Sequence, residues 1–121
     1  MFQYVLANLL ANNDNALGAL FLDDNGETVD LACAGYTPYQ MRVVGAYFGI
    51  YLRQLERVLV NTEIGGQPRL IHIEKKAIHI YAMPLSDGYY LVLVQRHPAL
   101  VARARETMAD AAAQLTRELF P

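Results

Sequence analysis

TPYQMRVVGAYFGIYLRQLERVLVN, residues 37–61, decides the fold because it predicts one long helix with more apolar surface than a single sheet needs. Thr37 can cap the free backbone N–H groups, Pro38 suits the first helical position, and Gln40 stands where a capping box places Glu or Gln. At 100° per residue the apolar side chains fill an arc of about 200°, against the ~100° stripe usual for a surface helix. The helix therefore requires a second partner besides its own sheet.

The remaining strip of this helix carries Gly45 and Gly49, one turn apart and flanked by charged side chains. Each glycine inside a helix costs about 1 kcal/mol relative to alanine. Either another element approaches the helix closely at this track, or tertiary burial offsets the loss. We expect the glycine track and its neighbouring arginines to face outward.

The chain on either side of this helix predicts two more helices and five strands. A first helix ends at the polar cluster 12–15, and a last helix begins at His97-Pro98, with proline at a permitted first position. Strands are predicted at 16–22, 27–34, 69–74, 77–83 and 89–95. The order α-β-β-α-β-β-β-α belongs to the α+β class. Apolar residues on both faces of the strands predict helices on both sides of the sheet.

Two turns determine how neighbouring strands pair. The turn at 23–26 contains Asn25-Gly26, the dipeptide best able to take positive φ at both central positions. A turn at Lys75-Lys76 sets Ile73 beside Ile78 on one face of the sheet and His72 beside His79 on the other.

Length, charge and cysteine content exclude several classes of protein. The chain has 121 residues, which predicts one domain over 1–121, and a net charge of −2 does not favour nucleic-acid binding. Cys33 is the only cysteine, so no disulfide within the chain is possible and a reducing, cytoplasmic setting is expected. No apolar run approaches the ~20 residues that span a bilayer, so we expect no membrane insertion.

The residues that an enzyme needs are scarce. Ser86 is the only serine and lacks the G-x-S-x-G elbow of a hydrolase. Cys33 stands among alanines on a predicted strand, which is typical of a small buried side chain. Gly65-Gly66 lacks the Lys and Ser/Thr of a phosphate-binding loop. We therefore expect no catalytic residue and no cofactor.

The pair His72 and His79, with Glu74 on the same face, is the best candidate for a small-ligand site. Two opposed imidazoles could share a metal ion, but the sequence shows no third ligand nearby. Two histidines in such a position are more often partly buried, hydrogen-bonded sheet residues, and their protonation would then make the chain mildly sensitive to pH near 6. Both interpretations remain open at this point.

The element order, the turn Asp23-Asp24-Asn25-Gly26, the small residues Ala32-Cys33-Ala34-Gly35, the long central helix and the isoleucine-rich strands together resemble the roadblock / dynein light chain family. The resemblance implies a profilin-like architecture. Its five-stranded antiparallel sheet has the order second, first, fifth, fourth, third, with the central helix on one face and the terminal helices on the other.

The resemblance also implies a homodimer. Strand 69–74 becomes a sheet edge that pairs with its copy, while the two central helices lie side by side. The sequence agrees independently, because an exposed edge reading RLIHIE is a template for pairing. The residues expected at the dimer interface are Val44, Tyr47, Tyr51, Val58, Arg69, Leu70, Ile71, His72, Ile73 and Glu74.

Members of this family are non-enzymatic platforms that often dock a small Ras-like GTPase across the paired central helices. The resemblance therefore implies a scaffold or regulatory subunit with such a partner. The residues expected to contact it are Arg42, Gly45, Gly49, Arg53, Glu56 and Arg57. The alternative is a sensory module of the profilin, PAS or GAF type, which would hold a small ligand in a pocket between helix and sheet.

Overall fold

The computed structural model describes residues 2–60 and 64–121, so the predicted helix end at Asn61 lies outside the described residues. The described elements follow the predicted order. They are α1 (Gln3–Ala11), β1 (Ala16–Leu22), β2 (Thr28–Cys33), α2 (Pro38–Val60), β3 (Ile71–Glu74), β4 (Ile78–Pro84), the short 3-10 helix η1 (Ser86–Gly88), β5 (Tyr90–Arg96) and α3 (Val101–Leu119).

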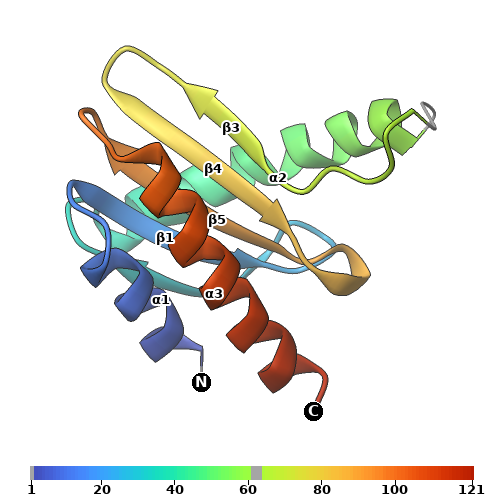
Figure 1. Cartoon of the computed structure of the whole chain (residues 1–121), viewed down its shortest axis with the longest axis horizontal. Helices are drawn as coiled ribbons and strands as arrows, with labels where there is room; N and C mark the ends of the chain where they lie inside the picture. Colours follow the sequence, from blue (N-terminus) through green and yellow to red (C-terminus); the bar gives the residue numbers. More distant parts are fainter. Residues whose placement is uncertain (1, 61–63) are drawn as a thin grey trace.

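The five strands form one antiparallel sheet in the order β2-β1-β5-β4-β3, as predicted. Figure 1 shows α1 and α3 on the near side of this sheet and α2 on the far side. Two hydrophobic clusters fill the spaces between these layers. The first joins α1 and α3 to the sheet around Phe21, Leu91 and Leu93, and the second joins α2 to it around Met41, Phe48 and Leu52.

The start of α2 is held by the predicted capping box. The backbone N–H of Gln40 donates to the Thr37 hydroxyl at 3.1 Å, and the backbone N–H of Thr37 donates to the Gln40 side-chain oxygen at 2.9 Å. The two bonds satisfy donors that have no partner inside the helix. The helix therefore begins where the sequence places it.

The glycine track of α2 faces the protein's own sheet, so the prediction that it faces outward is wrong. A Cβ built at Gly45 would stand 3.2 Å from Leu20 Cδ1 and 3.3 Å from Thr28 Oγ1. A Cβ built at Gly49 would stand 3.1 Å from both the Cα and the carbonyl oxygen of Gly26 in the β1–β2 turn. The close approach that the glycines permit is therefore made by β1, β2 and their turn.

The β1–β2 turn differs from the predicted form. Asn25 has no positive φ, whereas Gly26 has φ +78°. The Gly26 N–H donates to the Asp23 carbonyl at 3.0 Å, and the Asp23 side chain accepts from the N–H groups of Asn25 and Glu27 at 2.9 Å each. The Asp23 carboxylate thus organises a longer turn in which only Gly26 needs the left-handed conformation.

The β3–β4 turn lies one residue later than predicted, which moves the pairing of the two strands by two residues. The Lys75 N–H donates to the Ile78 carbonyl at 2.8 Å, so the loop is Lys76-Ala77. His72 consequently pairs with Tyr81, and Glu74 with His79. A two-residue shift keeps every side chain on its face but changes its opposite neighbour. The predicted opposition of His72 and His79 is therefore wrong.

Two further element boundaries differ from the predicted ones. β3 begins at Ile71, so Arg69 and Leu70 precede the strand. The last helix begins at Val101, and Pro98 therefore does not occupy its first position. No helix within the described ranges 2–60 and 64–121 is long and apolar enough to cross a bilayer.

Candidate functional site

The side of α2 away from the sheet carries a row of apolar side chains at three- and four-residue spacing, which only Gln54 interrupts. We define this apolar flank as Val43, Tyr47, Ile50, Tyr51, Leu55 and Val58. Tyr47, Tyr51 and Val58 are 63%, 60% and 62% exposed. Contiguous apolar patches of more than a few hundred Å² are uncommon on monomeric proteins. An exposed apolar flank of this kind is therefore expected where another protein covers the surface.

The apolar flank is turned toward the β3 end of the sheet. Gly45 and Gly49 pack against β1, β2 and their turn, and the flank is centred on the opposite side of the helix at 100° per residue. Val44 lies between the flank and the sheet and is half-buried against the second hydrophobic cluster. β3 is the sheet edge at that end and pairs only with β4 in the part of the chain that the structure describes.

The residues predicted for the dimer interface on the 69–74 segment are divided between the core and the surface. Leu70 and Ile71 are half-buried and contact the first and second hydrophobic clusters, respectively. The exposed residues of the segment are Arg69, His72, Ile73 and Glu74. The apolar flank and the edge of β3 thus provide two neighbouring features that a second copy could use.

The residues predicted for partner contact separate into two groups. Arg42, Arg53, Glu56 and Arg57 are exposed along α2, and we refer to them as the charged strip. The distance from Arg53 Nη2 to the position of a Cβ built at Gly26 is 3.6 Å, so Arg53 lies beside the β1–β2 turn. Gly45 and Gly49 are buried against that turn and its strands, so they are not accessible to a partner protein.

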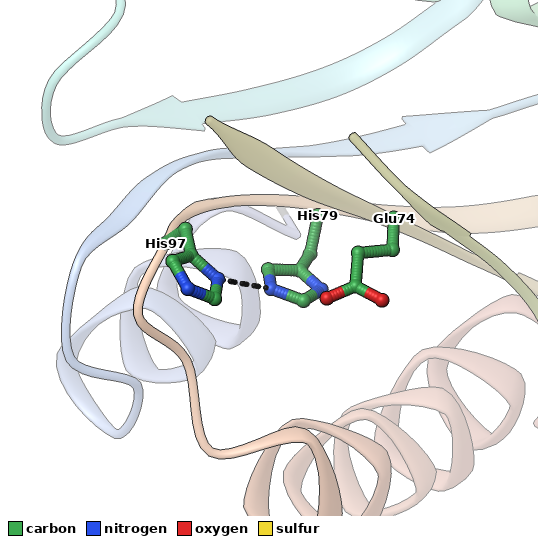
Figure 2. Close-up of side chains that lie close together, drawn as sticks. All are labelled: Glu74, His79 and His97. Atoms are coloured by element: carbon green, nitrogen blue, oxygen red, sulfur yellow. Dashed lines mark hydrogen bonds between the residues drawn. The ribbon is translucent and has the colours of Figure 1, made fainter. Parts of the chain in front are cut away.

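The opposite face of the sheet brings all three histidines together. His72 Nε2 lies 2.9 Å from His79 Nδ1, and His79 Nε2 lies 3.1 Å from His97 Nδ1. One ligand atom each of Glu74, His79 and His97 lie within 4.8 Å of one another. Figure 2 shows the Glu74 carboxylate and the His97 ring approaching His79 from two sides.

His97 is the member of this cluster that sequence reasoning missed. It follows β5, and the pairing of Ile78 with Arg96 places the end of that strand beside the start of β4. The His97 N–H donates to the Ala77 carbonyl at 2.9 Å. Strand order together with β4–β5 register would have been needed to find it, because His97 is 18 residues from His79 in the chain.

Burial raises the pKa of three side chains above their ordinary values, namely Cys33, Tyr81 and Tyr90. Burial raises the pKa of the Cys33 thiol, and nearby Arg42 acts in the opposite direction. Burial, and secondly Glu74, raise the pKa of Tyr81, whose hydroxyl donates to Gln95 Oε1 at 3.0 Å. A raised thiol pKa leaves little thiolate at neutral pH, so Cys33 is a poor nucleophile.

Tyr90 provides a prediction for alkaline pH. Burial and, secondly, the Glu56 carboxylate raise the pKa of its phenol above the usual value of about 10. A raised folded-state pKa contributes stability that is complete below the unfolded-state pKa and is lost as the pH rises through the folded-state pKa. As the pH rises above about 10, we therefore expect the free energy of unfolding to fall more steeply in the wild type than in Tyr90→Phe.

Urea unfolding at each pH measures this difference. Tyr39→Phe is the matched control, since it removes the same hydroxyl from a side chain that is 75% exposed. Equal slopes for the wild type and Tyr90→Phe would contradict the electrostatic assignment.

A surface hollow of about 680 Å³ lies at one end of the sheet. Glu56, the β4–β5 connection and the C-terminal half of α3 line it. The space between α2 and the sheet is filled instead by Met41, Phe48 and Leu52. This hollow therefore does not supply the pocket beneath the central helix that the sensory-module alternative requires.

The sheet order, with one helix on one face and two on the other, defines the profilin-like architecture of roadblock domains. No protein-family model matches the sequence, and a search of the curated proteins found no match. Solved structures nevertheless share its fold. A Roadblock/LC7 domain from Streptomyces avermitilis superposes with a TM-score of 0.86 at 15% identity, over 98% of each chain.

Two further similar structures come from Myxococcus xanthus. MglB has a TM-score of 0.83 at 14% identity, over 98% of this chain and 94% of its own. MglC has a TM-score of 0.71 at 17% identity, over 95% of this chain and 96% of its own. The chain therefore has the roadblock fold, and the fold implied by the resemblance is confirmed.

Proposed function

We propose that this protein is a non-enzymatic, homodimeric scaffold that binds a small Ras-like GTPase across its paired central helices. The observation that carries the proposal is the apolar flank, in which Tyr47, Tyr51 and Val58 on the long helix α2 are 63%, 60% and 62% exposed. A solvated helix face gains nothing from three such side chains, whereas an interface gains from burying them.

A two-fold axis beside β3 would cover both neighbouring features at once. The unpaired edge of β3 would continue the sheet into the second copy, and the two apolar flanks would meet above it. Exposed Ile73 lies on the same face of the sheet as Ile71, whose side chain contacts the α2 cluster. The second copy would therefore extend the apolar layer under α2.

The charged strip remains exposed in such a dimer, because it lies on the β2 side of α2. Arg42, Arg53 and Arg57 give this strip a positive balance against the single acid Glu56. A strip of this kind favours a partner with acidic side chains at its contact surface. The choice of a Ras-like GTPase rests on the roadblock resemblance, and the single Cys33 supports a reducing, cytoplasmic setting.

Charge reversal on the strip tests partner binding separately from dimerisation. We expect Arg53→Glu to weaken binding to the GTPase partner by roughly 30-fold, about 2 kcal/mol, because the substitution removes a favourable contact and adds repulsion. Calorimetric titration with the purified Ras-like GTPases of the same organism, in their GTP and GDP forms, measures the change. The sedimentation coefficient of the variant should stay that of the wild type.

Arg105→Glu supplies the matched control. Arg105 is also exposed but lies on α3, on the other face of the sheet. Equal loss of binding in both variants would show that the effect of Arg53→Glu comes from the change in net charge and not from a contact made by Arg53. Absence of binding to any of these GTPases by the wild-type protein would contradict the proposed partner while leaving the dimer untouched.

A further inference from the structure

The histidine cluster, which consists of His72, Glu74, His79 and His97, lies on the face of the sheet opposite to α2. Neither the apolar flank nor the charged strip uses it, whereas its two members on β3 lie on the edge proposed to pair with the second copy. Three separate elements supply its members: β3 carries Glu74, β4 carries His79, and the segment between β5 and α3 carries His97. Side chains that converge from three elements are positioned by the tertiary structure. These side chains therefore come together only in the folded protein.

The distance between two imidazole nitrogens matches the spacing of zinc ligands. Zn–N bonds of about 2.0–2.1 Å in a tetrahedral site place two nitrogen ligands roughly 3.3–3.4 Å apart. His79 Nε2 and His97 Nδ1 lie 3.1 Å apart. Binding one ion between them would require these two nitrogens to separate by a few tenths of an ångström.

Glu74 supplies a third ligand of the kind that zinc accepts. Its carboxylate oxygen lies within 4.8 Å of the ligand nitrogens of His79 and His97. Glu74 pairs directly with His79 across the strands, and its side chain is exposed. Glu74 would reach the ion only after rotating about its side-chain bonds, since Figure 2 shows its carboxylate on the side of the His79 ring away from His97. Two imidazoles and one carboxylate leave a fourth position open for water, as in zinc sites with three protein ligands.

His72 determines which nitrogen of His79 is available. His79 is 3% exposed, and its Nδ1 lies 2.9 Å from His72 Nε2. When Nδ1–H donates to His72, the lone pair on His79 Nε2 points toward His97. A hydrogen bond of this kind orients the ring and raises the basicity of a metal-binding histidine. The His72 ring is itself stacked on Tyr81, with ring centroids 4.7 Å apart.

His97 is held in place by backbone hydrogen bonds on both sides. The Arg96 N–H donates to the Asn15 carbonyl at 2.7 Å, and the His97 N–H donates to the Ala77 carbonyl at 2.9 Å. The Asn15 side-chain amide donates to the Pro98 carbonyl at 2.7 Å. These bonds limit movement of the segment that carries His97 and so reduce the ordering that ion binding would need.

We propose that Glu74, His79 and His97 bind a divalent transition-metal ion of the zinc class, and that His72 is a positioning residue for His79. The ligand set is of intermediate softness, which favours zinc and its neighbours over magnesium or calcium. A hydrogen bond between His79 and His97 would also explain their 3.1 Å separation. The carboxylate of Glu74 supplies the third ligand that distinguishes this arrangement from a hydrogen-bonded imidazole pair.

Titration of the full chain with zinc chloride in a weakly coordinating buffer tests the site. We expect one equivalent to bind per chain, and His97→Ala to weaken binding at least 100-fold. Glu74→Gln and His72→Phe should each weaken it by roughly 10- to 100-fold, the first by removing a ligand and the second by releasing the His79 ring. Glu27→Gln is the matched control, since it neutralises an exposed acid beside the distant β1–β2 turn.

Cobalt(II) provides a second readout, since its visible ligand-field bands are strong in a tetrahedral site and weak in an octahedral one. We expect strong bands in the wild type and in Glu27→Gln, and their loss in His97→Ala. Circular dichroism of the metal-free variants separates loss of the site from loss of the fold. Equal zinc affinity of the folded His97→Ala variant and the wild type, or weak cobalt bands with no saturable zinc binding, would overturn the proposal.

Discussion

Tyr51→Glu is expected to weaken self-association of the chain by about 100-fold, because it introduces a charge at the centre of the apolar flank. Buried tyrosines are frequent hot spots in interfaces, and losses of about 2–4 kcal/mol correspond to factors of roughly 30 to 1,000 in the dissociation constant. Tyr51 is 60% exposed in the single chain. The substitution should therefore leave the fold of each subunit intact while it removes the contact between subunits.

Sedimentation equilibrium over a range of concentrations measures this change. The wild type is expected near twice the 13.5 kDa chain mass, and the variant near the mass of one chain at micromolar concentration. Tyr4→Glu is the matched control, since Tyr4 is 56% exposed on α1, across the sheet from α2. A wild-type chain that stays monomeric at micromolar concentration would remove the dimer from the proposed function.

Gly49→Val is expected to destabilise the fold by roughly 2–3 kcal/mol through overpacking against the β1–β2 turn. Even a Cβ at this position would stand 3.1 Å from the Gly26 Cα and carbonyl oxygen. These are backbone atoms, and the hydrogen bonds of the Asp23 carboxylate within the turn restrict their movement. The added methyl groups of valine would therefore displace either the turn or the helix.

Urea unfolding of Gly49→Val and Ala46→Val together isolates this effect. Ala46 lies on the same helix and is exposed, so its replacement should cost less than about 0.7 kcal/mol, the difference in helix propensity. If the track faced outward, Gly49→Val would instead be neutral or stabilising, because almost any side chain improves on glycine inside a helix. The sign of the change thus tests the orientation of α2 directly.

Local patterns in the sequence were enough to predict the elements and their order. The Thr37–Gln40 capping box and the apolar periodicity placed α2, and apolar residues on both strand faces placed helices on both sides of the sheet. These signals depend on contacts between residues close in the chain, or on a repeat that every residue of an element shares. The order of the strands came from the resemblance to the roadblock family, since no local pattern determines it.

Register and helix rotation were decided by the tertiary structure alone. The β3–β4 loop at Lys76-Ala77 differs from the predicted one by a single residue, and both versions keep every side chain on the same face. The hydrophobic pattern therefore could not distinguish them. Only the assembled sheet shows that Glu74 opposes His79 and that His97 completes the cluster.

The rotation of α2 about its axis shows the same limit most clearly. Its apolar arc is wider than the sheet can cover, so periodicity left open which part of the arc faces inward. The structure turns Gly45 and Gly49 toward β1 and β2, because only glycine allows the helix to approach the Gly26 backbone this closely. The sequence alone thus determined that α2 has surplus apolar surface, whereas close backbone packing decided that this surplus is the flank beside β3.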